Sequence, residues 1–168
     1  QADQAHMQHL LNSNKDRVEH QIVIDRIVAA LRGVTSRLDI GETGVMTLRN
    51  VHHLHTPISG TLSENKGALP IIQLLHPTPA LGGEPRDLAM SLIQSLEPVT
   101  RGWYAAPVGW LDPHLNGAFG VAIRSMVAQA HRAWLYAGCG IVAKSDPTQE
   151  WRETELKLKP MMTALGIA

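Results

Sequence analysis

The sequence lacks the features that would tie it to an oxidising compartment or a membrane. Its 168 residues include one cysteine, Cys139, so no internal disulfide can form, as is usual in reducing compartments. It has no apolar run of the roughly 18 residues that a membrane-spanning helix needs. The polar N-terminus does not have the form of a signal peptide. We therefore expect a cytoplasmic protein with no membrane partner.

Neither sign of charge is in excess. The 15 acidic and 15 basic residues give a formal net charge of zero. A nucleic acid or an anionic membrane surface would favour a basic patch, so we expect neither as a partner. The sequence also has no P-loop, no dinucleotide-binding fingerprint and no serine-centred nucleophile elbow.

The order of predicted elements indicates an α+β fold. Apolar spacing predicts a helix over the first 32 residues, broken near residues 12–14 with Asn14 as a cap, and ended by Gly33. We predict a loop at 78–85 and a restart or kink of the last helix at Pro160. Strands are predicted at 37–40, 45–48, 51–58 (with a break at Pro57), 102–111, 118–127 and 133–142, and further helices at 67–75, 85–96 and 147–165. We find no linker that would divide the chain into two domains.

The last predicted helix carries the clearest polar set. Glu150, Glu153 and Lys157 share one face at spacings of three and four residues. Two carboxylates near a helix start can hold Mg²⁺, which prefers oxygen ligands and keeps several waters. The alternative is a solvated face with a Glu153–Lys157 salt bridge. Glu19, in the middle of the first helix, is by itself typical of a surface residue.

Histidines 52, 53 and 55 do not complete a zinc site. In a strand His53 and His55 would share one face, and two ligands are too few. We therefore expect these side chains to line a cleft or to be satisfied within the core.

Two further patterns are compatible with anion binding. Arg124 interrupts an apolar predicted strand and can fork onto a carboxylate, with Tyr104 adding a hydroxyl. The alternative is an ordinary structural pair. Gly138 and Gly140 stand where a strand normally carries bulk, which often marks the close approach of a ligand or of another backbone. Cys139, between them, has no base placed by sequence, so we expect it to be buried and inert.

Together these segments resemble the chorismate-binding family, which contains isochorismate, salicylate, anthranilate and aminodeoxychorismate synthases. The match covers nearly the whole chain in the right order. Its segments are Lys15-Asp16, Glu19-His20, 53–60 (HLHTPISG), 75–83 (LHPTPALGG), Gly109-Trp110, Ile123-Arg124, 137–142 (AGCGIV), 145–147 (SDP), 150–154 (EWRET) and Lys157. The resemblance implies part of an antiparallel-sheet fold flanked by helices, like that of anthranilate synthase component I.

The resemblance also implies roles for individual residues. It makes Glu19 and Glu153 ligands of Mg²⁺, with Glu150 close by, and the metal a bridge to the ring carboxylate of chorismate. The other implied contacts are with the substrate: Tyr104 and Arg124 with the enolpyruvyl carboxylate, the Gly138 backbone and Lys157 with the ring carboxylate, and His53 near the reacting ring carbons.

The segment containing Ala80 and Leu81 bears on the reaction. In anthranilate-forming and salicylate-forming relatives the position of Ala80 is typically Thr, whereas isochorismate synthases have Ala. The smaller side chain leaves room for water, so the resemblance implies water attack at C2, loss of the C4 hydroxyl, and reversible formation of isochorismate. Residues 101–110 (RGWYAAPVGW) are most similar to menaquinone-pathway enzymes. A siderophore- or salicylate-pathway isochorismate synthase is the alternative.

The family places its general base, a Lys, and its general acid, a Glu, upstream of the segment that matches Glu19. Only 18 residues precede Glu19 here, and Lys15 is too close to it to be that base. We therefore expect this chain to be the C-terminal part of a single chorismate-binding domain and to be inactive by itself. A second polypeptide carrying the upstream part is an expected partner. The remaining alternative is a non-catalytic chorismate-binding fragment.

Overall fold

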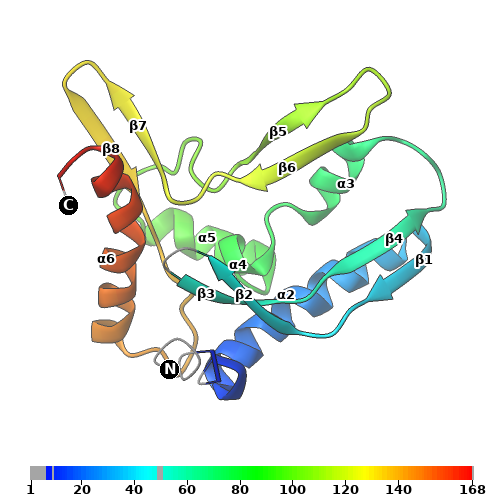
Figure 1. Cartoon of the computed structure of the whole chain (residues 1–168), viewed down its shortest axis with the longest axis horizontal. Coiled ribbons are helices and arrows are strands. Elements are labelled where there is room, and N and C mark those ends of the chain that lie inside the picture. The colour runs from blue at the N-terminus through cyan, green and yellow to red at the C-terminus, as the bar shows by residue number, and fades with distance from the viewer. Residues whose placement is uncertain (1–6, 9, 49–50, 168) are drawn as a thin grey trace. The chain divides into compact units, whose positions relative to one another are not determined.

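The computed structural model describes residues 7–8, 10–48 and 51–167. They form two compact units, Gln1–Ala80 and Leu81–Ala168. Helices and small antiparallel sheets make up both units, which confirms the predicted α+β class (Figure 1).

The first unit is built on helix α2 (Asn14–Arg32), which buries Ile24 and Val28. Ser13 interrupts the helical residues and caps α2, because its hydroxyl accepts a hydrogen bond from the Asp16 amide (3.3 Å). The predicted break is therefore confirmed, but the cap is Ser13 and not Asn14. Gly33 ends the helix as predicted.

Four strands follow as two antiparallel pairs. Strand β1 (Thr35–Ile40) pairs with β4 (Ile58–Leu62), and β2 (Gly44–Leu48) pairs with β3 (Val51–His55). The predicted break at Pro57 is confirmed, because β3 and β4 are separated there. The strand prediction missed the continuation of β4 beyond Ile58.

Three helices follow: α3 (Ala68–Leu75) in the first unit, α4 (Pro79–Gly82) at the boundary, and α5 (Arg86–Leu96) in the second unit. The prediction that residues 78–85 form only loop is wrong, because they include the single turn α4. Pro79 is tolerated in a first turn, where no backbone N–H is needed. Gly83, with φ of 71°, then ends the turn in a conformation that favours glycine.

The second unit contains two hairpins. Strand β5 (Pro107–Leu111) pairs with β6 (Gly117–Val121), and β7 (Ser125–Gln129) pairs with β8 (Arg132–Tyr136). The long predicted strands at 102–111, 118–127 and 133–142 are therefore too long. Positive φ angles at Ala105 (66°) and Arg124 (50°) break the extended conformation before β5 and between β6 and β7. Tyr104 consequently lies in a turn and Arg124 in a bend, and neither is in a strand.

The chain ends in helix α6 (Pro147–Ala164), capped by Asp146, whose carboxylate accepts from the Gln149 amide at 2.9 Å. The helix continues through Pro160, so it does not restart there. No helix among the residues described is both long and apolar enough to cross a membrane.

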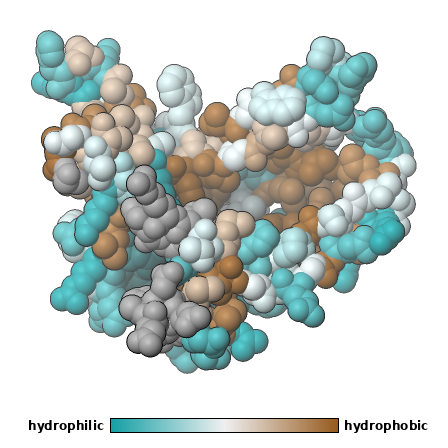
Figure 2. All heavy atoms as spheres, in the orientation of Figure 1, coloured by the Kyte–Doolittle hydropathy of each residue, from teal (hydrophilic) through white to brown (hydrophobic). Residues whose placement is uncertain are grey.

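Much apolar surface is left uncovered. Helix α5 exposes Leu88, Leu92 and Leu96 by 61%, 50% and 76%, and their four-residue spacing puts them on one face. In Figure 2, hydrophobic residues are visible at the surface among polar ones. Buried apolar residues in the described part of the chain are limited to Ile24, Val28 and Ala105.

The β5–β6 hairpin allows a matched stability test. A Cβ at Gly109 would overlap the Ala118 carbonyl oxygen and lie 2.6 Å from the Phe119 ring, whereas a Cβ at Gly120 would meet nothing within 4 Å. We predict that Gly109→Ala lowers the free energy of unfolding by about 1–3 kcal/mol, the usual cost of overpacking. Gly120→Ala is the control. Urea unfolding followed by circular dichroism measures both, and equal midpoints for the two variants would contradict this account of the hairpin.

Candidate active site

Tyr104 and Arg124 are brought close to each other by backbone hydrogen bonds. The Ala105 amide donates to the Ala122 carbonyl and the Ala122 amide donates to the Ala106 carbonyl, both at 2.9 Å. These reciprocal bonds join the turn that carries Tyr104 to the segment that leads into Arg124. The two predicted carboxylate ligands, 20 positions apart in sequence, are thus held on adjoining backbone segments.

Tyr136 lies next to both of these segments. It ends β8 and pairs in register with Ser125, the residue after Arg124. Its ring stacks on that of Tyr104, with centroids 5.5 Å apart and planes inclined by 19°. Burial raises the pKa of the Tyr104 hydroxyl, so the hydroxyl stays protonated near neutral pH and can donate a hydrogen bond to an anion.

Gly138 lies next to the same hydroxyl. A Cβ on Gly138 would be 3.4 Å from the Tyr104 hydroxyl oxygen. The Gly138 carbonyl accepts a hydrogen bond from Lys157 Nζ at 3.0 Å, and Lys157 also forms an ion pair with Glu153 Oε1 at 2.6 Å. Residues 137–140 are irregular and not strand, so their close approach to Tyr104 comes from a connecting segment.

Helix α6 turns a polar face toward this segment. Glu150 is only 4% exposed and is the buried charged residue of the described chain. Thr154 donates to the Glu150 carbonyl at 3.0 Å and approaches Cys139 Sγ at 3.6 Å. The predicted common face of Glu150, Glu153 and Lys157 is therefore the face that meets residues 138 and 139. The Glu153–Lys157 salt bridge that the alternative interpretation predicts is also present on this face.

Cys139 is half-buried, so its predicted full burial is wrong. Burial is the largest cause and raises the pKa of the Cys139 thiol. The Thr154 hydroxyl lowers this pKa, and hydrogen bonding to Glu150 raises it. The thiol is therefore mostly protonated near neutral pH, in agreement with the expectation that it is inert.

The chemistry of the α6 face fits Mg²⁺. Glu150 and Glu153 offer carboxylate oxygens one turn apart, and a divalent cation offsets the cost of a buried carboxylate. Glu19, the third predicted ligand, lies on α2 in the first unit, where Lys15 Nζ is 3.8 Å from its Oε1. Within either unit, the described residues form no group of three or more His, Cys, Asp or Glu side chains suited to a metal.

The histidines of the first unit make polar contacts. His53 is exposed on β3, His52 Nδ1 lies 3.1 Å from the Thr47 hydroxyl, and His20 Nε2 lies 2.8 Å from the Thr56 hydroxyl. Burial lowers the pKa of His20, and the neighbouring His55 lowers it further. The role of His53 next to the substrate stays a prediction.

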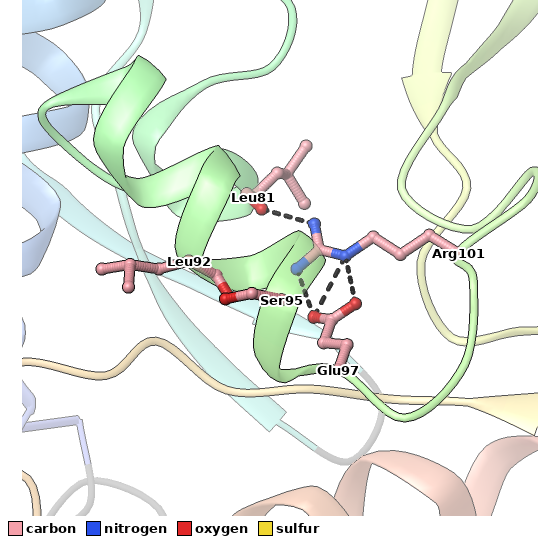
Figure 3. A network of polar contacts seen from close by, with 5 residues as sticks. All are labelled: Leu81, Leu92, Ser95, Glu97 and Arg101. Atoms are coloured by element: carbon pink, nitrogen blue, oxygen red, sulfur yellow. Dashed lines mark hydrogen bonds and ion pairs between the residues drawn. The ribbon is translucent and has the colours of Figure 1, made fainter.

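Ala80 and Leu81 belong to the single-turn helix α4, where Ala80 is exposed and Leu81 half-buried. The Leu81 carbonyl accepts a hydrogen bond from Arg101 Nη1 at 2.7 Å, and Arg101 is held by Glu97 (Figure 3). No motif in the sequence predicts this contact. The four-residue spacing of Glu97 and Arg101 was the available signal, but nothing in it indicated that Arg101 reaches residue 81.

The environment of Cys139 generates a prediction. Because the Thr154 hydroxyl lowers the Cys139 pKa, we predict that Thr154→Val raises it, so that alkylation by iodoacetamide has its midpoint at higher pH. Thr163→Val, an exposed change on the same helix, is the control. Alkylation is followed by mass spectrometry in EDTA, with the urea-unfolded chain as reference. A midpoint for the folded chain at or below that of the unfolded chain would contradict the stated effect of burial.

Residues 1–166 match the family model described as chorismate binding enzyme. The chain is 48% identical over 158 residues to the isochorismate synthase MenF of Bacillus subtilis, covering 94% of this chain and 34% of the relative. It is 49% identical over 160 residues to the salicylate biosynthesis isochorismate synthase of Pseudomonas aeruginosa, covering 95% and 34%.

Among solved structures, a putative 2,3-dihydroxybenzoate-specific isochorismate synthase from Bacillus anthracis superposes with a TM-score of 0.96 at 37% identity. That match covers 99% of this chain and 45% of the other. The chain thus spans about a third of the curated relatives' length. With a family model matched over nearly all of its residues, the chain belongs to the chorismate-binding enzymes.

Proposed function

We propose that the enzyme containing this chain converts chorismate reversibly to isochorismate. Water adds at ring C2 and gives up a proton to a base, both ring double bonds shift by one bond, and the C4 hydroxyl leaves as water after protonation. The enolpyruvyl group is retained, so no pyruvate is released. The observation that carries the proposal is that Tyr104 and Lys157 both lie against Gly138. The segment containing Gly138 lies next to the carboxylates of α6. Two relatives that are isochorismate synthases support it further.

In this proposal, chain groups hold the two carboxylates of the substrate. The Tyr104 hydroxyl and the Arg124 guanidinium bind the enolpyruvyl carboxylate, for which a forked donor and a neutral hydroxyl are suited. The Gly138 backbone and Lys157 bind the ring carboxylate. The ion pair with Glu153 limits the positions that the Lys157 ammonium can take, which favours a defined substrate orientation.

Mg²⁺ is the proposed cofactor, with Glu19, Glu150 and Glu153 as its protein ligands. When bound, it supplies positive charge to the ring carboxylate. His53 is proposed to line the pocket near the reacting carbons. Ala80 and Leu81 are proposed to leave space for the attacking water, which separates this reaction from those of relatives with Thr at that position.

Proton transfer is proposed to depend on a base and an acid supplied by an upstream segment, on the same or a second polypeptide. The exposed leucines of α5 favour a further covering element, because exposed apolar patches of that kind mark interaction sites. We further propose a cytoplasmic enzyme of menaquinone biosynthesis, supported by residues 101–110. A siderophore- or salicylate-pathway enzyme is the alternative.

The decisive experiment measures turnover with and without an upstream segment. The chain is assayed alone and after joining to, or co-expression with, the upstream part of the Bacillus subtilis relative, using chorismate and Mg²⁺. We predict isochorismate and no pyruvate from the assembled enzyme, and no turnover by the chain alone, since each lost acid or base costs about 10²–10⁴-fold. Pyruvate as the main product would instead indicate a lyase. Turnover by the chain alone would refute the proposed division of roles.

The proposed metal ligands are tested on the assembled enzyme. We predict that Glu150→Gln and Glu153→Gln each weaken Mg²⁺ binding by about 10- to 100-fold or more, since even outer-shell partners of a metal have effects of that size. Glu155→Gln, on the exposed side of the same helix, is the control. Calorimetric titration with Mg²⁺ measures the affinities independently of activity. Unchanged affinity in both site variants would remove these residues from the metal site.

A further inference from the structure

Arg101 makes an unusually complete set of contacts for a residue outside the proposed substrate ligands. Its Nε lies 2.9 Å from Glu97 Oε2 and its Nη2 lies 2.7 Å from Glu97 Oε1, so the guanidinium forks onto the carboxylate. Its remaining terminal nitrogen, Nη1, donates to the Leu81 carbonyl at 2.7 Å. Figure 3 shows the Arg101 guanidinium, the Glu97 carboxylate and the Leu81 carbonyl with these contacts as dashed lines. Hydrogen bonding to Glu97 raises the Arg101 pKa, so the charge is permanent.

The acceptor on Leu81 is a carbonyl that its own helix cannot satisfy. The last carbonyls of any helix have no intrahelical partner, and α4 has only one turn. Gly83 then turns away with φ of 71°, and a Cβ there would lie 2.6 Å from Ala89 Cβ on α5. The Leu81 carbonyl is part-buried, so its hydrogen bond to a charged donor is worth more than an exposed ion pair.

The backbone of Arg101 contacts the turn that carries Tyr104, a proposed substrate ligand. Its carbonyl accepts a hydrogen bond from the Tyr104 amide at 2.8 Å, which closes the turn that carries Tyr104. One residue therefore connects the segment containing Ala80 and Leu81 with the turn that presents the Tyr104 hydroxyl. Glu97, the residue at the C-terminal cap of α5, binds two nitrogens of the guanidinium while the third reaches Leu81.

We propose that Arg101, held by Glu97, is a positioning residue that fixes the Ala80-Leu81 segment relative to the turn of Tyr104. It touches neither substrate nor metal. Its effect is to keep the space for the attacking water at a constant distance from the bound enolpyruvyl carboxylate. This proposal rests on the proposed function, because Ala80 and Tyr104 act on chorismate only there.

Arg101→Lys and Glu97→Gln test the proposal. Lysine keeps the charge but lacks the planar fork, so it cannot bind Glu97 in two places and also reach Leu81. Ser95→Ala and Arg37→Lys are the controls: the first removes a hydroxyl of α5 bonded to the Leu92 carbonyl, and the second alters an exposed ion pair with Asp39.

Two readouts separate positioning from general stability. Hydrogen exchange of the full chain reports the amides of residues 80–83, for which we expect about tenfold faster exchange in Arg101→Lys and Glu97→Gln, the effect of losing one charged hydrogen bond. In the assembled enzyme we expect kcat to fall about tenfold while KM for chorismate changes less than about threefold, because the loss concerns the water and not substrate binding.

Exchange and kcat equal to those of the controls would overturn the proposal. Faster exchange with unchanged kcat would overturn the positioning role and leave only a structural contact. Ala80→Thr, which fills the same space directly, should lower isochorismate formation whether or not Arg101 is changed. If the unsubstituted assembled enzyme forms no isochorismate, the proposed function fails, while the exchange measurement still decides whether Arg101 fixes residues 80–83.

Discussion

The contact between α6 and the segment after β8 is the constraint on which the candidate site depends. Lys157 bonds the Gly138 carbonyl, and Thr154 meets Cys139, so one helix face is fastened to a segment without regular structure. An irregular segment has no ladder to hold it, and its backbone groups need other partners. The side chains of α6 supply them. They also bring Glu150 and Glu153 next to Cys139, the residue after the glycine that lies against the Tyr104 hydroxyl.

The second constraint is that two segments predicted to be long strands are interrupted by a turn and a bend. Extended through 102–111 and 118–127, the chain would place Tyr104 and Arg124 on ladders with alternating faces. Positive φ at Ala105 and Arg124 ends this regularity, and the reciprocal bonds between Ala122 and residues 105 and 106 replace it. Non-glycine residues in that region of φ are uncommon and often occur where function requires them. One of the two is the proposed ligand Arg124 itself, and the other, Ala105, follows the proposed ligand Tyr104; Leu115 and Ala130 have positive φ as well, in the connections of the two hairpins.

Much of this could be predicted from local signals. Helical spacing and the break at Pro57 were sufficient to predict most elements, and the spacing of Glu150, Glu153 and Lys157 predicted their common face. The turns at Ala105 and Arg124 could not be predicted, because neither residue type signals positive φ. The Arg101–Leu81 bond was equally hidden, since its acceptor is a backbone carbonyl 20 residues away and any residue type provides one.

Charge balance links the proposed metal to the proposed substrate. In the second unit, Glu150 and Glu153 are matched in formal charge by Lys157 and Arg124, and Glu19, the remaining proposed metal ligand, adds one negative charge. Chorismate carries two carboxylates, and bringing both into a partly buried site adds two more uncompensated negative charges. A divalent cation offsets two of these three charges. Metal and substrate should therefore each strengthen the binding of the other, and by thermodynamic linkage the two enhancements are equal.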